Sequence, residues 1–296
     1  QKMARPVYSM SGFGDGAVTS DAFAVRLEIR TVNNRGSKIS FRSRPPLNAY
    51  EKNLRDLIAE RLQRGSIDVS VTLNRQLSPE IGGQIEEAAR GAVTTIRAIA
   101  KKLNIAGEVT VSDLLAIPGL FSESLNEPVT AEEWPAIEQA TRAALDKLCA
   151  MRAAEGRATA ERLLEILKPV EDFQKLARER APLVVARQRE KLMARLTELG
   201  EVRDADQQSL EREMVFYADH VDINEEMDRL ASHAAQFRAT IAQGGEIGKR
   251  LEFLAQEFLR EVNTTASKAN DLTITAAAVD AKTAVEKLKE QTANIE

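Results

Sequence analysis

The residues best suited to chemistry in this sequence are concentrated between Asp219 and Lys268. Both histidines of the chain, His220 and His233, lie there among carboxylates and arginines. Histidine can transfer protons near neutral pH, and carboxylate oxygens bind hard divalent cations. The segment therefore predicts acid–base or metal-assisted chemistry.

Four residues of this segment share one side of a predicted helix. They are Asp222, Glu226, Arg229 and His233. At 100° per residue these positions fall within about 60° of one another, beside an apolar stripe. Carboxylates that border a buried face are partly desolvated, which suits them to bind a metal or to exchange protons.

A second line of charged residues follows on the next predicted helix. It consists of Arg250, Glu257, Glu261 and Lys268. If the two helices pack antiparallel, the two lines could face each other. Oxygen ligands with at most one imidazole suit Mg²⁺ or Mn²⁺. The predicted metal ligands are Asp222, Glu226, Glu257 and Glu261.

The same spacing has a second interpretation. Acids and bases at i, i+4 are typical of solvated helix faces and of ion pairs. From spacing alone this structural interpretation is the stronger one. For His220, whose i+4 position holds only Asn224, we expect a surface or structural role.

The elements that would position these residues begin with a sheet. Alternating apolar and polar residues predict strands at 8–16, 22–33, 37–44 and 66–75. The turn residues at 33–36 suggest a hairpin between the second and third strands. A helix within 46–64 would cover one face, giving an antiparallel or mixed sheet. The fold class predicted is α+β.

From about residue 82 the periodicity is helical. We expect an N-terminal α+β domain at 1–156, a long helical connector at 157–205 and a C-terminal helical domain at 206–296. The last would hold three helices, about 207–242, 246–267 and 270–295. Asn270 and Asp271 are predicted to cap the third helix.

No motif for another common chemistry is present in the sequence. It has no Walker-type loop, dinucleotide GxGxxG or nucleophile-elbow GxSxG. The glycine-rich run at 11–16 precedes a strand, so a tight edge or turn is expected there rather than a phosphate cradle.

Composition describes a globular chain of 296 residues that is 43% hydrophobic and 29% charged, with a net charge of −4. The acidic total argues mildly against nucleic-acid binding. Locally, however, bases outnumber acids between 26 and 44, where Glu28 is the one acid. One cysteine excludes an intramolecular disulfide, and no apolar run or signal core predicts membrane insertion or export. We therefore expect a cytoplasmic protein.

Several segments together resemble the YicC/YloC family of bacterial proteins. The resemblance spans essentially the whole chain and is most specific in the C-terminal third. Its motifs are YSMSGFG at 8–14, EIRTVNNR at 28–35, RGSIDV at 64–69, DINEEMDRL at 222–230 with His233, GKRLEF at 248–253, QE at 256–257, RE at 260–261, NT at 263–264, SKA at 267–269 and NIE at 294–296. Leu259 departs from the family's usual Asn, and Gly36 and Ser37 replace a bulkier pair.

The resemblance implies an endoribonuclease that acts on single-stranded or small regulatory RNA. It also implies a divalent metal and a ring-like homo-oligomer, expected as a hexamer. Glu226, Glu257 and Glu261, with Asp222, would then hold the ion. His233 would transfer protons, and Arg229 or Arg250 would stabilise negative charge. The residues expected to bind RNA are Arg26, Arg30, Arg35, Lys38, Arg42 and Lys268.

Two other functions remain open at this point. In the first, the chain is a non-catalytic RNA-binding or adaptor scaffold that recruits another nuclease, and its charged lines are ion pairs. In the second, it is a metal-dependent enzyme acting on a small phosphoester, which would be indifferent to competing RNA.

Overall fold

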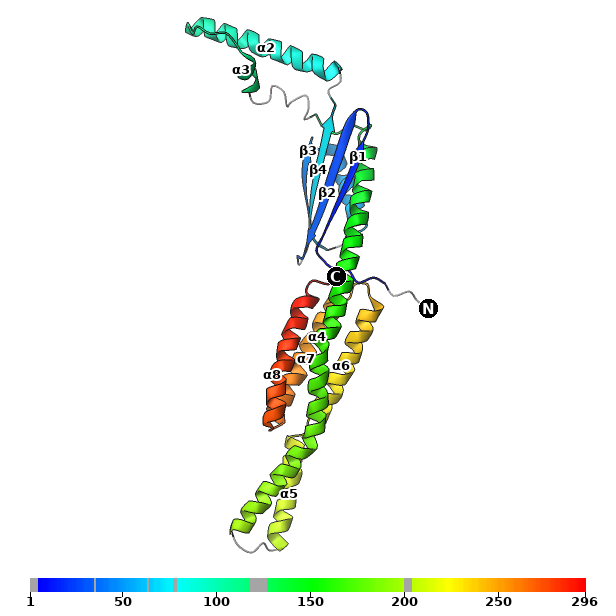
Figure 1. Cartoon of the computed structure of the whole chain (residues 1–296), viewed down its shortest axis with the longest axis vertical. Helices are drawn as coiled ribbons and strands as arrows, with labels where there is room; N and C mark the ends of the chain where they lie inside the picture. Colours follow the sequence, from blue (N-terminus) through cyan, green and yellow to red (C-terminus); the bar gives the residue numbers. More distant parts are fainter. Residues whose placement is uncertain (1–4, 35, 63, 77–78, 118–126, 200–203) are drawn as a thin grey trace. The chain divides into compact units, whose positions relative to one another are not determined.

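The structure is a computed structural model that describes residues 5–34, 36–62, 64–76, 79–117, 127–199 and 204–296 (Figure 1). It divides into two compact units. Unit 2 comprises Met10–Arg152, and unit 1 comprises Gln1–Ser9 with Ala153–Glu296. The predicted α+β class is confirmed, because the sheet lies in unit 2 and unit 1 is helical. The predicted three-part domain division remains a prediction.

Unit 2 is built on a four-stranded mixed sheet. Its strands are β1 (Gly12–Thr19), β2 (Phe23–Val32), β3 (Ser37–Arg44) and β4 (Gly65–Arg75), in the order β1-β2-β4-β3. β4 runs antiparallel to β2 and parallel to β3. The predicted hairpin between β2 and β3 is therefore wrong, because β4 pairs between them.

One face of the sheet is buried. Val25, Leu27 and Ile29 of β2 alternate with more exposed residues and point into the core of unit 2. The short helices η1 (Asn48–Tyr50) and α1 (Glu51–Ala59) and the first turns of α4 (Trp134–Leu199) contribute the rest of this core. The predicted helix within 46–64 is thus confirmed, although it is shorter.

The glycine-rich run forms the edge strand β1. A Cβ added at Gly14 would lie 2.0 Å from the carbonyl oxygen of Ala144, and one at Gly16 would lie 1.9 Å from that of Ala140. Only glycine leaves room for α4 to pack this closely on the strand. The glycine-rich run at 11–16 therefore allows close packing of α4 on the edge strand, in agreement with the tight edge expected from the sequence.

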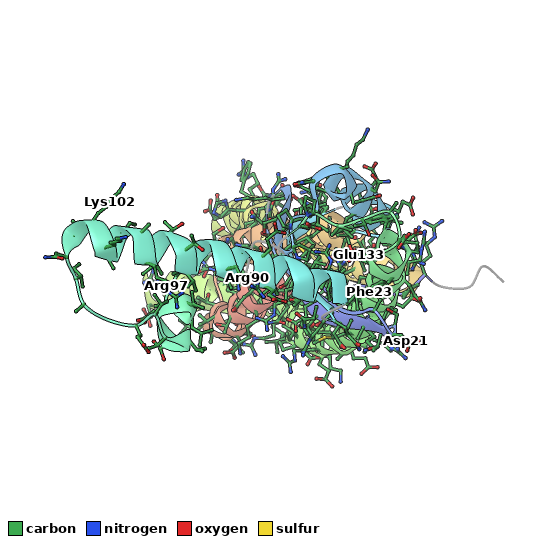
Figure 2. All side chains as sticks on the ribbon, turned by 90° about the horizontal axis from the view of Figure 1, so that it is seen from above. Asp21, Phe23, Arg90, Arg97, Lys102 and Glu133 are labelled. Atoms are coloured by element: carbon green, nitrogen blue, oxygen red, sulfur yellow. The ribbon has the colours of Figure 1, made fainter. Side chains whose placement is uncertain are left out.

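Two further helices belong to unit 2. They are α2 (Pro79–Leu103) and α3 (Val111–Leu115), and Thr110 and Asp113 form a capping box at the start of α3. Figure 2 labels Arg90, Arg97 and Lys102 along α2, and all three side chains are exposed.

The entry to α4 is fixed by a buried ion pair. Arg75 of β4 donates to Glu133 at 2.6 Å, and the backbone N–H of Thr130 donates to the same carboxylate. Burial alone would raise the pKa of Glu133, but the hydrogen bonds from Arg75 and Thr130 outweigh burial and lower it. Glu133 thus connects the start of α4 to Arg75 of β4 and to the backbone of Thr130.

Unit 1 contains the remainder of α4 and four C-terminal helices. These are α5 (Asp204–His220), α6 (Asn224–Gln243), α7 (Gly248–Lys268) and α8 (Leu272–Thr292). The single helix predicted at 207–242 is wrong, because the chain leaves helical conformation at Val221–Ile223. The helices predicted at 246–267 and 270–295 are present with slightly different ends.

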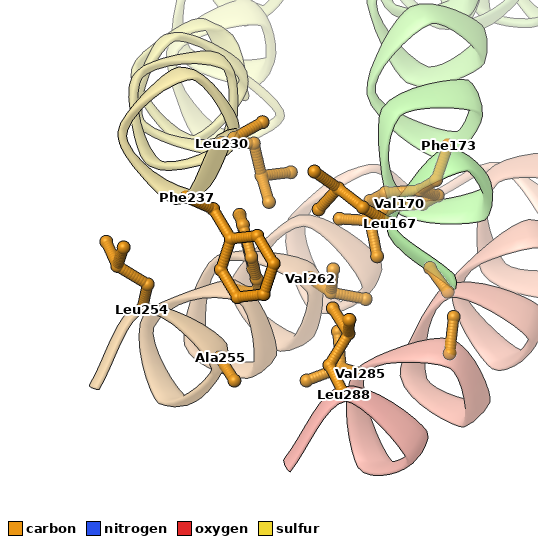
Figure 3. Packing of buried hydrophobic residues seen from close by; sticks show 14 of the residues in the cluster. Leu167, Val170, Phe173, Leu230, Phe237, Leu254, Ala255, Val262, Val285 and Leu288 are labelled. Carbon is orange, nitrogen blue, oxygen red and sulfur yellow. The ribbon is translucent and has the colours of Figure 1, made fainter. Parts of the chain in front are cut away.

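The core of unit 1 lies where α4, α6, α7 and α8 meet (Figure 3). Its labelled side chains come from all four helices: Leu167, Val170, Phe173, Leu230, Phe237, Leu254, Ala255, Val262, Val285 and Leu288. Residues 5–8 also contact the rest of unit 1, since Arg5 N–H donates to the carbonyl of Gln243 and Glu296 N–H donates to that of Tyr8. In the described part of the chain, no helix combines the length and the apolar character needed to traverse a membrane.

Candidate metal centre

The candidate site lies on the paired helices α6 and α7. Each has an apolar stripe at helical spacing, and Phe237 of α6 packs against Phe258 of α7 with ring centroids 5.8 Å apart. Glu226 near the start of α6 contacts Lys268 at the end of α7, whereas His233 further along α6 lies near Glu257 and Glu261. The two helices are therefore antiparallel, and their charged lines face each other within one chain.

Three side chains converge in a group suited to a cation. His233, Glu257 and Glu261 each offer one ligand atom, and these atoms lie within 4.8 Å of one another. We call this group the HEE cluster. The Glu261 side chain is only 2% exposed and that of Glu257 is 23% exposed, so one carboxylate is buried and the other reaches the surface.

His233 has an unusual environment for a histidine. Its Nδ1 atom is buried and has no hydrogen-bond partner among the residues that the structure describes. The ring meets Phe258 edge-on, at 6.4 Å between centroids and 79° between planes, so one side of the imidazole packs on an aromatic ring. A buried polar nitrogen without a partner is costly, and a bound cation would satisfy it.

Glu226, a predicted metal ligand, lies outside the HEE cluster. Lys268 donates to its Oε1 at 2.7 Å, and this hydrogen bond raises the pKa of Lys268 above its ordinary value. The Glu226 side chain is 5% exposed, and among the described residues no group bonds its buried Oε2. The structure thus places two residues with different predicted roles, metal binding and RNA binding, in one ion pair.

Asp222 also lies outside the HEE cluster, for a local reason. It is in the break between α5 and α6, where its Oδ1 accepts a hydrogen bond from the backbone N–H of Asn224 at 2.9 Å. Its side chain is exposed at the start of α6. Short acidic residues satisfy free N–H groups at helix starts, so Asp222 interrupts the helix rather than extending the charged line.

The arginines differ in their distance from the cluster. Arg229 pairs with Glu225 at 2.5 Å and reaches Glu261 at 3.6 Å. Arg260 lies 3.8 Å from Glu257, a neighbour that sequence analysis missed although the i+3 spacing contains the signal. Arg250 is exposed, and no contact that the structure describes links it to the cluster.

Asp271 organises the start of α8 beside this helix pair. As predicted it caps the helix, accepting from the backbone N–H groups of Thr273 and Ile274. It also receives Arg180 at 2.9 Å and Arg187 at 3.3 Å from α4. The hydrogen bond from Arg180 is the main cause that lowers the pKa of Asp271 to about 2. The sequence pattern contains no signal for this pairing, because Arg180 and Arg187 lie 91 and 84 residues from Asp271.

The predicted RNA-binding residues of the N-terminal region lie on the open face of the sheet in unit 2. Arg26, Arg30, Lys38 and Arg42 are exposed there, and Arg35 is outside the described residues. β4 brings Asp68 between Arg30 and Ser40, and Ser70 between Glu28 and Arg42. Arg26 pairs with Glu28 at 3.0 Å. This face is therefore mixed in charge, and less basic than the sequence of β2 and β3 indicates.

Arg30 and Arg42 border a depression of about 470 Å³ on that face. The guanidinium of Arg30 lies over the ring of Phe13, 5.4 Å from its centroid, which supports the orientation of the side chain. The carboxylates of Glu28 and Asp68 line the same depression, so the two guanidinium groups could contact phosphate oxygens only against this opposing charge.

Comparison with known proteins covers both halves of the chain. Residues 7–161 match the family described as "Endoribonuclease YicC-like, N-terminal region", and residues 177–296 match "Endoribonuclease YicC-like, C-terminal". The HEE cluster lies entirely within the second match.

Two relatives have the same extent as this chain. A "Probable endoribonuclease YicC" of Clostridioides difficile is 31% identical over 294 residues, covering 97% of this chain and 99% of the relative. A protein with the same description from Haemophilus influenzae is 31% identical over 296 residues, covering 98% and 100%. The similarity therefore includes the sheet of unit 2 as well as the helices that carry the cluster.

Proposed function

Because this chain belongs to the YicC-like endoribonuclease family, we propose that it hydrolyses RNA phosphodiester bonds at the HEE cluster with a divalent cation. The observation that carries the location is the convergence of His233, Glu257 and Glu261 within 4.8 Å. Membership of the family supports the reaction, and the convergence of these side chains on the helix pair supports its proposed location.

The residues present fit a cation. Two carboxylates and an imidazole nitrogen form a set that Mn²⁺ or Mg²⁺ can use, the imidazole favouring Mn²⁺. A bound cation would supply Lewis-acid chemistry, activating a water or the 2′-hydroxyl and offsetting phosphate charge. His233, Glu257 and Glu261 would hold it, while Asp222 and Glu226 have other partners in the structure.

This assignment changes the predicted role of His233. An imidazole nitrogen that holds a cation has no lone pair for proton transfer, so the two roles compete. The buried position of Nδ1 favours the cation. If His233 is a ligand, excess Mn²⁺ should partly restore cleavage by His233→Ala; if it transfers protons, the metal requirement stays unchanged and the pH profile of cleavage changes.

Arg229 would contact the phosphate. Its side chain is 46% exposed and its guanidinium lies 3.6 Å from Glu261, so it can face both the cluster and an incoming anion. A guanidinium in this position offsets charge that develops on phosphate oxygens. On the sheet of unit 2, Arg30 and Arg42 would contact the RNA backbone independently of base sequence.

The test is cleavage of a labelled single-stranded RNA by highly purified protein, with and without EDTA. We expect Glu257→Gln, Glu261→Gln and His233→Ala to lower the cleavage rate by about 100-fold or more while RNA binding persists. The matched control is Glu252→Gln, which removes an exposed carboxylate from the same helix. Wild-type cleavage rates in the purified cluster variants would refute the proposed site.

One observation favours a second candidate, the non-catalytic RNA-binding scaffold. Several charges of the helix pair are engaged in ion pairs, including Glu226 with Lys268 and Arg229 with Glu225. Such pairs are also what a structural role requires. In the same assay a scaffold would bind RNA, and no cleavage would co-purify with it.

We further propose that the substrate is single-stranded or small regulatory RNA and that the chain forms a homo-oligomer, expected as a hexamer. Both follow from the resemblance to the family. A mass measured by light scattering on the purified protein tests the second proposal, and a result of one subunit would exclude it.

A further inference from the structure

The end of α5 and the junction of α7 with α8 enclose a pocket of about 430 Å³ within unit 1. The residues that matter here are Tyr217, His220, Ser267, Lys268, Asn270 and Leu272. We call it the α5 pocket. It is separate from the HEE cluster, and the sequence pattern indicated no role for Tyr217.

The α5 pocket combines two planar rings with hydrogen-bonding groups. Asn270 donates from Nδ2 to the hydroxyl of Tyr217 at 2.9 Å, which fixes the position of the phenol. His220 is exposed at the end of the same helix, three residues further on. Unpaired nucleobases stack on aromatic side chains and hydrogen-bond with neighbouring polar groups, so these wall residues suit a base.

The wall of the pocket includes the ammonium group of Lys268 and the carboxylate of Asp271, which is paired with Arg180 and Arg187. Lys268 is 40% exposed, and its ammonium group is held at 2.7 Å by the buried carboxylate of Glu226. An ammonium at the wall of a pocket that accepts a base is suited to the phosphate attached to that nucleotide.

The α5 pocket and the HEE cluster lie along the same pair of helices. Seven residues separate Glu226 from His233 on α6, and seven separate Glu261 from Lys268 on α7. Seven residues correspond to two turns, or about 10 Å along each helix. This spacing is short enough for one RNA strand to span the distance between the pocket and the cluster.

We propose that the α5 pocket is a nucleotide subsite that holds one unpaired base of the RNA strand near the cleaved bond. The base stacks on Tyr217 and His220, and Lys268 contacts the adjacent phosphate. This inference rests on the proposed function for its ligand. It adds a reason for single-stranded substrates, because the faces of a base within a duplex are covered by its neighbours.

The experiment measures RNA binding without cleavage. Fluorescence anisotropy follows a labelled, unstructured RNA oligonucleotide in EDTA at fixed salt. We expect Tyr217→Ala and His220→Ala each to weaken binding about fivefold or more, as expected for the loss of one stacking partner. Tyr217→Phe keeps the ring and should bind within about twofold of wild type.

The matched control is Phe253→Ala, which removes another exposed aromatic ring of unit 1 that does not line the pocket. It should leave affinity unchanged. Thermal melting monitored by circular dichroism checks folding of every variant. If Tyr217→Ala does not fold, the exposed His220→Ala decides the outcome. Wild-type affinity in both alanine variants overturns the proposal, and so does an equal loss in Phe253→Ala.

A second arm tests contact with a base directly. Oligonucleotides with an abasic residue at successive positions should show one position where wild-type binding falls, and Tyr217→Ala should be insensitive to that change. The same penalty in both proteins would contradict the subsite. Because this arm needs neither metal nor cleavage, its outcome is independent of whether the HEE cluster proves to be the cleavage site.

Discussion

At the scale of single residues, two buried polar atoms of α6 stand out, one in the HEE cluster and one outside it. Nδ1 of His233 and Oε2 of Glu226 are both buried, and neither bonds to any group within the described ranges. An unsatisfied buried polar group destabilises the folded state by about 1–3 kcal/mol. We therefore expect another interaction, such as a bound ligand, to offset this cost. For His233 the compensation we infer is a cation shared with Glu257 and Glu261.

Cation binding should therefore stabilise the protein. At a Mn²⁺ concentration 100 times its Kd, the expected gain is about 2.7 kcal/mol, which raises the melting temperature by roughly 5–10 °C for a unit of this size. Differential scanning fluorimetry with and without EDTA measures the shift. Glu261→Gln should abolish it and Glu252→Gln should retain it; equal shifts in the two variants would place the cation elsewhere.

The ion pair between Glu226 and Lys268 leads to a prediction about the free energy of unfolding. Lys268→Met leaves the buried carboxylate of Glu226 unpaired and should cost about 1–3 kcal/mol, less than for a fully buried pair because Lys268 is 40% exposed. Urea unfolding measures this cost. Adding Glu226→Gln to Lys268→Met removes the unpaired charge and should recover part of the loss. If the double variant is as unstable as the sum of both single variants, the ion pair does not account for the effect.

At the scale of helices and strands, the sequence predicts the type of each element better than it predicts which elements pair with one another. The alternation in β2 and β4 located those strands, but pairing of β3 with β4 depends on a contact between distant segments. Likewise the helical periodicity of the sequence continues through Val221–Ile223. The structure breaks the helix there, and the backbone N–H of Asn224 donates to the side chain of Asp222. The lines carrying His233, Glu257 and Glu261 were predictable because each lies within one helix. Which acid pairs with which base was not predictable, because the pairing depends on how far α6 and α7 are shifted along each other.

The cap of α8 gives a pH-dependent prediction. Asp271→Asn keeps a capping oxygen but loses the charge that pairs with Arg180 and Arg187. The folded pKa of about 2 lies below the ordinary value of 3.8, so the ionised carboxylate stabilises the fold above pH 4. That stability is lost as the pH falls from about 4 to 2. We expect a cost of about 1–2 kcal/mol at pH 7, allowing for screening at the exposed Arg187.

Urea unfolding of wild type and Asp271→Asn across this range checks the sign. The difference in unfolding free energy should be largest at neutral pH and should narrow below pH 4. A difference that stays constant down to pH 2 would show that capping geometry, and not charge, distinguishes the two proteins.

For the whole molecule, the distribution of charge matters more than its sum. A net charge of −4 repels RNA on average, so binding requires local groups that face the strand. The structure offers such groups in both units: Arg30 and Arg42 around the depression on the sheet, and Lys268 in the α5 pocket. The composition alone, which argues mildly against RNA, could not reveal these local surfaces because it averages over them.

The dependence of RNA affinity on salt separates local contacts from net charge. Each phosphate contact contributes about 0.7 to the slope of log affinity against log salt for a single strand. Replacing Arg30 and Arg42 with Ala should therefore lower the magnitude of the slope by up to about 1.4. The control replaces Arg97 and Lys102, exposed on α2 (Figure 2), and removes the same charge. If RNA lies on the sheet face, the first variant loses slope and the second does not. Equal losses would mean that total charge governs binding, and the sheet face would then have no special part in holding RNA.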